Sequence, residues 1–147
     1  MFSSHEIAPD EHAVWFARLL SREKPLYFVA ELAGRPIGVV GFTDLDSINR
    51  RAEWSLHIGE YDVSRGAGTA MGALAIDHFF ADGAFEKLCC CVLAGNEASL
   101  KMHRRLGFKQ EGLRSRHVWR DGVPVDVHEF GLFADAWHRL PVRPAAG

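Results

Sequence analysis

The sequence predicts a single α/β domain, with a mixed and mostly antiparallel central sheet flanked by helices. Its 147 residues are enough for one hydrophobic core rather than two. Hydrophobic residues make up 48% of the chain and charged residues 24%, which is typical of a globular protein. Periodicity predicts the order helix, strand, strand, strand, helix, strand, helix, strand, strand. Such an order favours a sheet covered by helices, formed by residues 1–147 as one domain.

The first element is predicted to be a helix over about residues 9–21. Pro9 suits the first helical position, and the acidic residues Asp10 and Glu11 complement the positive end of the helix dipole. Apolar residues then recur at helical spacing: Trp15, Phe16, Leu19 and Leu20.

Three strands are predicted to follow this helix. Residues 26–30 and 37–42 are rich in β-branched and aromatic residues and enclose a turn, so they are expected to form a hairpin. Residues 44–51 are polar and are expected to form a loop. Residues 52–58 then alternate, which places one set of side chains on the face opposite to Trp54: Glu53, Ser55 and His57.

The second half of the chain predicts two helices and three more strands. A helix over about residues 69–82 follows a glycine cluster, and the apolar residues 87–93 are expected to form a central strand covered on both faces. Asn96 is expected to cap a helix that ends at Gly107. Two long strands, at 108–119 and 123–133, and a short helical tail complete the chain.

Charge and cysteine content exclude several classes of function. The formal net charge is −2 and the pI is about 6.4, so we expect neither nucleic-acid binding nor a polybasic membrane anchor. No apolar run is long enough for a membrane helix, and the N-terminus does not resemble a secretory signal. The three cysteines, Cys89 to Cys91, are adjacent, which predicts no disulfide framework and no metal site. We expect them to be buried in a strand, and we expect a cytoplasmic location.

The segment from Ser64 to Gly72 is predicted to bind phosphate. It lies between a strand and a helix, where free backbone N–H groups and the helix dipole favour an anion. Small residues allow a close approach, and Arg65 can add a charged hydrogen bond. A P-loop would need a Lys after the glycines, and a dinucleotide fingerprint would need a small residue where Met71 stands.

The remaining pattern, Arg65-x-x-Gly68-x-Ala70, resembles the acyl-CoA diphosphate loop of the GNAT (Gcn5-related) N-acetyltransferases. Further segments resemble the same superfamily in order along residues 7–137. Leu106-Gly107-Phe108 after the Asn96 helix cap is one of them. Glu111 to Arg114 resembles the ribosomal-protein-acetyltransferase-like branch, and Gly38 to Asp46 resembles the branch that acetylates a UDP-linked 4-amino-sugar. The fold is therefore expected to be GNAT-like.

The resemblance also predicts a departure at the N-terminus. Members of the superfamily begin with a strand before the helix that we place at residues 9–21. This chain starts too late to contain that strand, so either its start site was assigned late or its sheet lacks the first strand. A missing edge strand would expose unpaired backbone groups, which a homodimer would cover.

Acetyl-CoA is the co-substrate that the resemblance implies, with no metal. The thioester carbonyl is expected to accept a backbone N–H from the strand before the glycine loop, near Leu56 to Ile58. Asn96 and Ser99 are expected to contact the pantetheine arm, to serve their own helix, or both. The full set of expected cofactor-binding residues is Leu56, Ile58, Arg65, Gly66, Ala67, Gly68, Thr69, Ala70, Asn96 and Ser99.

Three residues are candidates for proton transfer. Glu53 and His57 share a strand face, and either could be the general base, unless water carries the proton. Many members of the superfamily place a Tyr as general acid five residues before the Phe of the Gly-Phe pair. His103 stands at that position here, and it could protonate the leaving thiolate or merely lie on the surface of its helix.

The predicted function is N-acetyl transfer from acetyl-CoA to a primary amine, by direct attack in a ternary complex. By its branch resemblance, the acceptor is expected to be a small molecule such as a nucleotide-linked amino-sugar. The alternatives are an acceptor that is a protein N-terminal amine and a non-catalytic acyl-CoA-binding module. Asp44 and Asp46 could orient a cationic amine or serve as turn residues.

Overall fold

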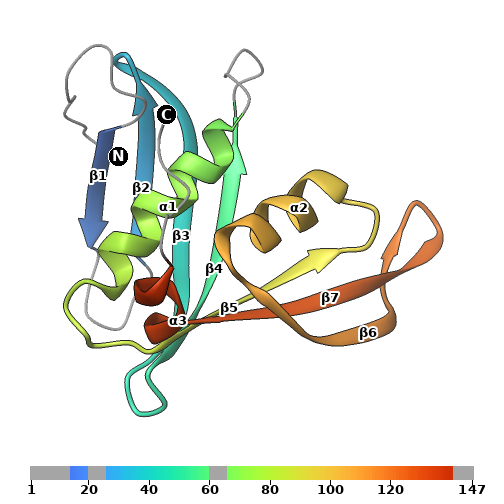
Figure 1. Ribbon diagram of the computed structural model, residues 1–147. Coiled ribbons are helices and arrows are strands. Elements are labelled where there is room, and N and C mark those ends of the chain that lie inside the picture. The colour runs from blue at the N-terminus through green and yellow to red at the C-terminus, as the bar shows by residue number, and fades with distance from the viewer. Residues whose placement is uncertain (1–13, 20–25, 60–65, 141–147) are drawn as a thin grey trace.

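The computed structural model describes residues 14–19, 26–59 and 66–140, which form a seven-stranded sheet and three helices (Figure 1). The strand order is β1-β2-β3-β4-β5-β7-β6, and every neighbouring pair is antiparallel except β4 and β5. The strands are β1 (Val14–Leu19), β2 (Leu26–Leu32), β3 (Arg35–Asp46), β4 (Arg51–Ile58), β5 (Lys87–Leu93), β6 (Lys109–Arg120) and β7 (Val123–Phe133). The helices are α1 (Ala67–Phe80), α2 (Glu97–Leu106) and α3 (Ala134–Arg139). The predicted mixed, mostly antiparallel sheet with helices is confirmed.

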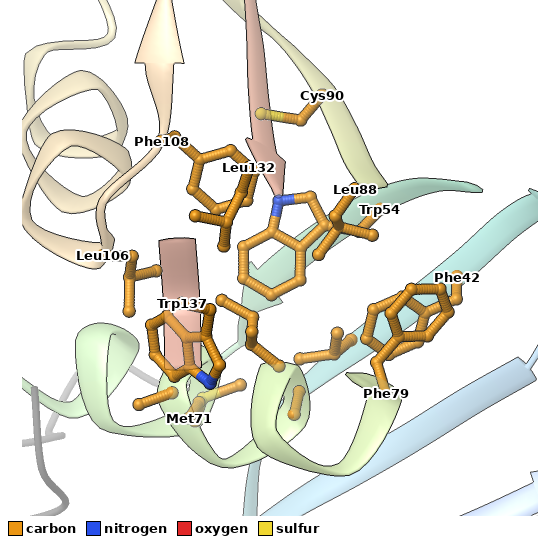
Figure 2. Packing of buried hydrophobic residues seen from close by; sticks show 14 of the residues in the cluster. Phe42, Trp54, Met71, Phe79, Leu88, Cys90, Leu106, Phe108, Leu132 and Trp137 are labelled. Atoms are coloured by element: carbon orange, nitrogen blue, oxygen red, sulfur yellow. The ribbon is translucent and has the colours of Figure 1, made fainter. Parts of the chain in front are cut away.

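The hydrophobic core lies between the sheet and its helices, which cover one face (Figures 1 and 2). Phe42 of β3 stacks on Phe79 of α1, with ring centroids 4.5 Å apart, and Trp54 of β4 stacks on Phe108 at 5.5 Å. The indole N–H of Trp137 in α3 donates to Asp77 of α1 at 2.7 Å. These contacts fix α1 and α3 against the sheet. Within the described ranges, no helix is long and apolar enough to cross a membrane.

The opposite face of the sheet carries no helix from the described part of the chain. Because β4 alternates, Glu53, Ser55 and His57 point to this face. The cysteines follow the same rule: Cys90 is buried in the core, whereas Cys89 is half-buried and Cys91 is exposed. The prediction that β5 is covered on both faces is therefore wrong, since apolar residues alone do not show whether anything covers them.

The parallel ladder between β4 and β5 is short. It joins Arg51 to Lys87, Ala52 to Leu88 and Glu53 to Cys89, and it then stops. By contrast, β5 pairs with β7 along its whole length, from Lys87 to Leu93. Beyond Glu53 the two parallel strands diverge, as Figure 1 shows, and no backbone ladder joins them; we call this unpaired stretch the opening in the sheet.

The predicted N-terminal helix is wrong within the described residues. Val14–Leu19 forms the strand β1, which pairs antiparallel with β2. Within the described residues, the sheet therefore has an edge strand before β2. Two physical reasons apply: Val14, Trp15 and Phe16 favour extended backbone, and β2 would otherwise present an unpaired edge. The remaining residues of the predicted helix lie outside the described ranges, and the homodimer stays a prediction.

Most other boundaries agree with the sequence analysis. The strand predicted at residues 87–93 is confirmed, as is the helix that begins after Asn96 and ends at Gly107, where φ is 101°. The loop predicted at residues 44–51 is shorter than expected, because β3 continues to Asp46. An irregularity between Thr43 and Asp46, with φ of 49° at Asp44, lets the strand bend there without ending.

Candidate functional site

The opening between β4 and β5 exposes backbone donors of β4. The N–H of Gly59 donates to the carbonyl of Ile37 at 2.9 Å, and alternate residues of an antiparallel strand face the same neighbour. The N–H group of His57 therefore points to β3, and those of Leu56 and Ile58 point to the side of β5. Because the ladder has already stopped at Glu53, these two N–H groups have no strand partner among the described residues.

The start of α1 supplies further free donors. Gly66 is the N-cap, with φ of 90°, and it makes no side-chain cap hydrogen bond. The first intrahelical bond in this turn is from the N–H of Ala70 to the carbonyl of Gly66, at 3.0 Å. The preceding N–H groups, those of Ala67, Gly68 and Thr69, therefore lack an acceptor in the described structure, and no acidic side chain occupies the first turn.

The two sets of donors lie close together. A Cβ atom added at Gly68 would lie 2.9 Å from Cδ1 of Ile58, so the first turn of α1 packs directly on the end of β4. The same added atom would lie 3.5 Å from Sδ of Met102, which places α2 beside this turn. Gly68 thus permits a close approach that a larger residue would prevent. Arg65, the expected cationic partner of an anion here, lies outside the described residues.

The start of α2 is capped by a side chain of the same segment. The side-chain oxygen of Asn96 accepts a hydrogen bond from the N–H of Ser99 at 3.2 Å, and Glu97 lies in the first turn. The hydroxyl of Ser99 lies 3.3 Å from Nδ1 of His103. Asn96 and Ser99 therefore both serve their own helix, which agrees with two of the three alternatives given by the sequence. Their contact with a cofactor stays a prediction.

His103 is a buried residue whose two ring nitrogens are both engaged. Nε2 lies 3.1 Å from the indole nitrogen of Trp54, and Nδ1 lies 2.8 Å from the carbonyl oxygen of Ser99. An indole N–H can only donate, so Nε2 accepts and the ring proton resides on Nδ1. Burial lowers the pKa of His103, and the hydrogen bond to Ser99 opposes this effect only in part. The imidazole is thus neutral and only 5% exposed.

This geometry corrects the alternative that His103 lies on the surface of its helix, while its role as a general acid stays a prediction. Its single ring proton is bonded to a carbonyl of its own helix, and Nε2 presents a lone pair rather than a proton. The sequence could not show this, because Trp54 lies on a different strand, 49 positions away.

Glu53 lies where the ladder ends, on the face opposite to the core. Burial raises the pKa of the Glu53 carboxyl, and the carboxylates of Asp44 and Glu129 raise it further. Arg51 acts in the opposite direction but more weakly. A carboxylate with a raised pKa is a better proton acceptor, so these surroundings suit a general base. His57 lies two residues further along the same face and is exposed.

Sequence reasoning missed three residues near this site. Trp54 was not connected with His103, and Cys89 and Glu129 were not connected with Glu53. Their proximity depends on the register between β4, β5 and β7, which pairs Glu53 with Cys89 and Cys91 with Glu129. No local pattern in the sequence carries that register.

Comparisons with known proteins identify the family. The model of the acetyltransferase (GNAT) domain matches residues 1–109. The chain is 33% identical over 85 residues to the spermidine N(1)-acetyltransferase of Escherichia coli (strain K12), which covers 58% of this chain and 46% of that protein. It is 27% identical over 104 residues to the protein YdaF of Bacillus subtilis (strain 168), which carries a ribosomal N-acetyltransferase name; the match covers 71% of this chain and 57% of YdaF.

A solved structure agrees with these matches at the level of the fold. It is a spermidine N-acetyltransferase from Vibrio cholerae in complex with CoA and spermine. The TM-score is 0.73 at 22% identity, and the alignment covers 78% of this chain and 69% of that one. The present chain spans about half the length of the curated relatives just described. The match to the family model, over most of the chain, shows that this protein belongs to the GNAT acetyltransferase family.

Proposed function

We propose that this protein is an N-acetyltransferase that transfers the acetyl group of acetyl-CoA to a primary amine. One observation carries the proposal: the uncapped first turn of α1 packs on the end of β4, whose own N–H groups face an opening in the sheet. A CoA thioester carries negative charge at its diphosphate and a carbonyl at its acyl end. The two sets of donors match these two groups.

The diphosphate would bind at the start of α1. The free N–H groups of Ala67, Gly68 and Thr69, together with the helix dipole, attract an anion. From there the pantetheine arm would pass into the opening between β4 and β5. The thioester oxygen would accept a hydrogen bond from Leu56 or Ile58, and such a donor stabilises the charge that develops on that oxygen during attack.

Glu53 is the proposed general base, and His57 is the alternative on the same strand face. An alkylamine reaches the site protonated and must lose a proton before its nitrogen can attack the carbonyl carbon. After attack, the C–S bond breaks, CoA leaves as a thiolate, and the new amide nitrogen loses its extra proton. The thiolate takes a proton from solvent, since His103 has none to offer in the observed arrangement.

Direct attack is favoured over an acyl-cysteine intermediate. Burial raises the pKa of the Cys91 thiol, and the carboxylates of Glu53 and Glu129 raise it further. Burial and Glu53 also raise the pKa of Cys89, although Lys87 opposes this. The thiolate is the nucleophilic form of cysteine, so neither residue is activated for acyl transfer.

A cationic amine is the proposed acceptor class. Glu53 has no ion-pair partner among the described residues, and Asp44 and Glu129 interact with it as like charges. A protonated amine or polyamine would relieve this repulsion, whereas the diphosphate of a nucleotide-linked amino-sugar would add to it. The relationship to a spermidine N(1)-acetyltransferase supports the same class. The amino-sugar expected from the sequence is therefore the comparison substrate for the assay.

The test is an assay of free thiol release from acetyl-CoA with a panel of amines. Spermidine, a UDP-linked 4-amino-sugar and a peptide with a free N-terminal amine represent the three acceptor classes. We expect the highest kcat/KM with spermidine. Preference for either of the other two would overturn the acceptor class but not the reaction.

Ligand binding separates the enzyme from its alternatives. Because a ligand that binds only the folded state raises Tm, acetyl-CoA should raise the Tm and NAD should not. A Tm shift with acetyl-CoA but no thiol release with any amine would indicate a non-catalytic binding module. A shift with NAD alone would refute the proposal.

A further inference from the structure

We propose that Trp54 and His103 are positioning residues that hold β4 and α2 at a fixed separation across the opening in the sheet. The inference rests on the proposed function, because the opening is where the acyl end of CoA would lie. It assigns to His103 a role different from acid catalysis.

The two residues continue the connection between β4 and β5 where the backbone ladder ends. The last residue of β4 that pairs with β5 is Glu53, and Trp54 follows it directly. Its indole N–H donates to Nε2 of His103 at 3.1 Å, and Nδ1–H of His103 donates to the carbonyl of Ser99 at 2.8 Å. Ser99 belongs to the first turn of α2, which follows β5. Two consecutive hydrogen bonds, from Trp54 to His103 and from His103 to the backbone of Ser99, thus span the point where the strands separate.

This pair of hydrogen bonds is rigid because each nitrogen in it can act only as donor or only as acceptor. The indole can only donate, so His103 must accept at Nε2 and donate at Nδ1. A rotation of the imidazole would break both bonds. Aromatic rings also hold it in place: its centroid lies 5.0 Å from that of Phe108 and 6.0 Å from that of Phe130. The distance between β4 and the start of α2 is therefore set by side chains that do not reach the exposed face.

The consequence falls on the backbone that would hold the thioester. Leu56, whose N–H faces the opening, lies two residues beyond Trp54 on the same strand. A shift of Trp54 would move this donor relative to the acyl carbonyl, whereas the free N–H groups proposed to hold the diphosphate belong to a different element, α1. A misplacement of about 1 Å near reacting groups can cost on the order of 100-fold in rate. Loss of the Trp54–His103 bond should therefore lower kcat more than it weakens CoA binding.

The experiment compares three variants that keep an aromatic ring at each position. Trp54→Phe removes the donor, His103→Phe removes both nitrogens, and the third variant combines the two. We expect each single variant to lower kcat by roughly 10- to 100-fold, with a Kd for CoA within about threefold of the unchanged protein. The double variant should recover part of the lost Tm, because no buried polar group is left without a partner, but it should not recover kcat.

His128→Phe is the matched control. Its ring also stacks on Phe130, with centroids 6.3 Å apart, and its Nδ1 contacts Gln110, but it does not bridge to β4. This variant should keep kcat. If a general reduction of histidine content or packing were responsible, His128→Phe would lower kcat as well, and the inference would be wrong.

The outcomes separate this inference from the alternatives. If His103 were a general acid, Trp54→Phe would free Nε2 and leave kcat high, which would contradict the inference. If the bond were only structural, Tm would fall in the single variants while kcat of the folded protein stayed unchanged, and the inference would again fail. If the unchanged protein neither binds acetyl-CoA nor releases thiol, the proposed function itself has failed.

Discussion

The strands of the two strand–helix units β4–α1 and β5–α2 are parallel, yet the helices of these units begin in different ways. The first turn of α1 has a glycine cap, no acidic residue and free N–H groups. The first turn of α2 has the Asn96 cap and the acidic residue Glu97. The same fold element thus appears once without a side-chain cap and once with a cap that binds the N–H of Ser99.

The difference shows how function and stability are divided between the units. Free N–H groups at a helix start leave potential stabilisation unused, and a side-chain cap is worth about 1 kcal/mol. Unit β4–α1 omits the cap where the cofactor is proposed to bind. Unit β5–α2 keeps its cap, and its later residue His103 is the one proposed to fix the geometry of the opening.

The largest expected effect on kcat comes from Glu53, which lies on β4 at the end of its pairing with β5. Glu53→Gln should lower kcat on the order of 100- to 10,000-fold, because it removes the proposed base. Cys91→Ser, on the same face of β5, is the matched control and should keep kcat. Burial raises the pKa of Glu53, so its charged form destabilises the fold above the unfolded pKa, and the substitution should not lower Tm at about pH 7. An unchanged kcat would transfer the base role to His57 or to water.

The next effect compares the two helix starts directly. Thr69→Glu places a carboxylate beside the free N–H groups of α1, and Ala98→Glu places one at the equivalent turn of α2. At about 6 Å and an effective dielectric constant of about 20, a like charge costs roughly 3 kcal/mol, which corresponds to about 100-fold in affinity for CoA. Isothermal titration calorimetry should show this loss for Thr69→Glu alone. Equal losses in both variants would remove the distinction between the two helices.

A smaller effect concerns the cap itself. Asn96→Ala should lower the free energy of unfolding by about 1 kcal/mol, as measured by chemical denaturation, because the N–H of Ser99 loses its acceptor. The Kd for CoA should stay the same if Asn96 serves only its helix. A Kd weakened by about tenfold or more would support the contact with the pantetheine arm that the sequence predicted.

The smallest effect is a dependence of stability on pH. The pKa of His103 is lowered in the folded state, so its contribution is fully present above the unfolded pKa of about 6.5 and is lost as the pH falls through the folded pKa. The difference in unfolding free energy between the unchanged protein and His103→Phe should therefore shrink between about pH 7.5 and pH 5. A difference in unfolding free energy that stays constant with pH would show that burial does not lower the pKa of His103.

Local signals predicted much of unit β5–α2. Asn96 and Gly107 mark the ends of α2 because capping is a property of neighbouring residues, and the apolar run at 87–93 marked β5. The segment at 14–19 was mistaken for a helix because six residues cannot distinguish the two periodicities. Pairing with β2, a tertiary contact, decides its structure.

The candidate site was predictable only in part. The glycine cluster and the position of Glu53 follow from local patterns, and the structure places Gly68 against the end of β4, as a shared site requires. The surroundings of His103 were not predictable, because they consist of Trp54 and of a ring on a distant strand. The pKa of Glu53 is raised first by burial, then by Asp44 and by Glu129, and only the sheet register brings Glu129 near.

The most direct test of the account is an NMR titration of the labelled protein with CoA, followed through its backbone amides. Amides that donate to the diphosphate shift on binding, and each residue is observed separately. The account predicts large shifts for Ala67, Gly68 and Thr69, and little change for Ala98 and Ser99. Shifts confined to the start of α2, or none at either helix, would contradict it.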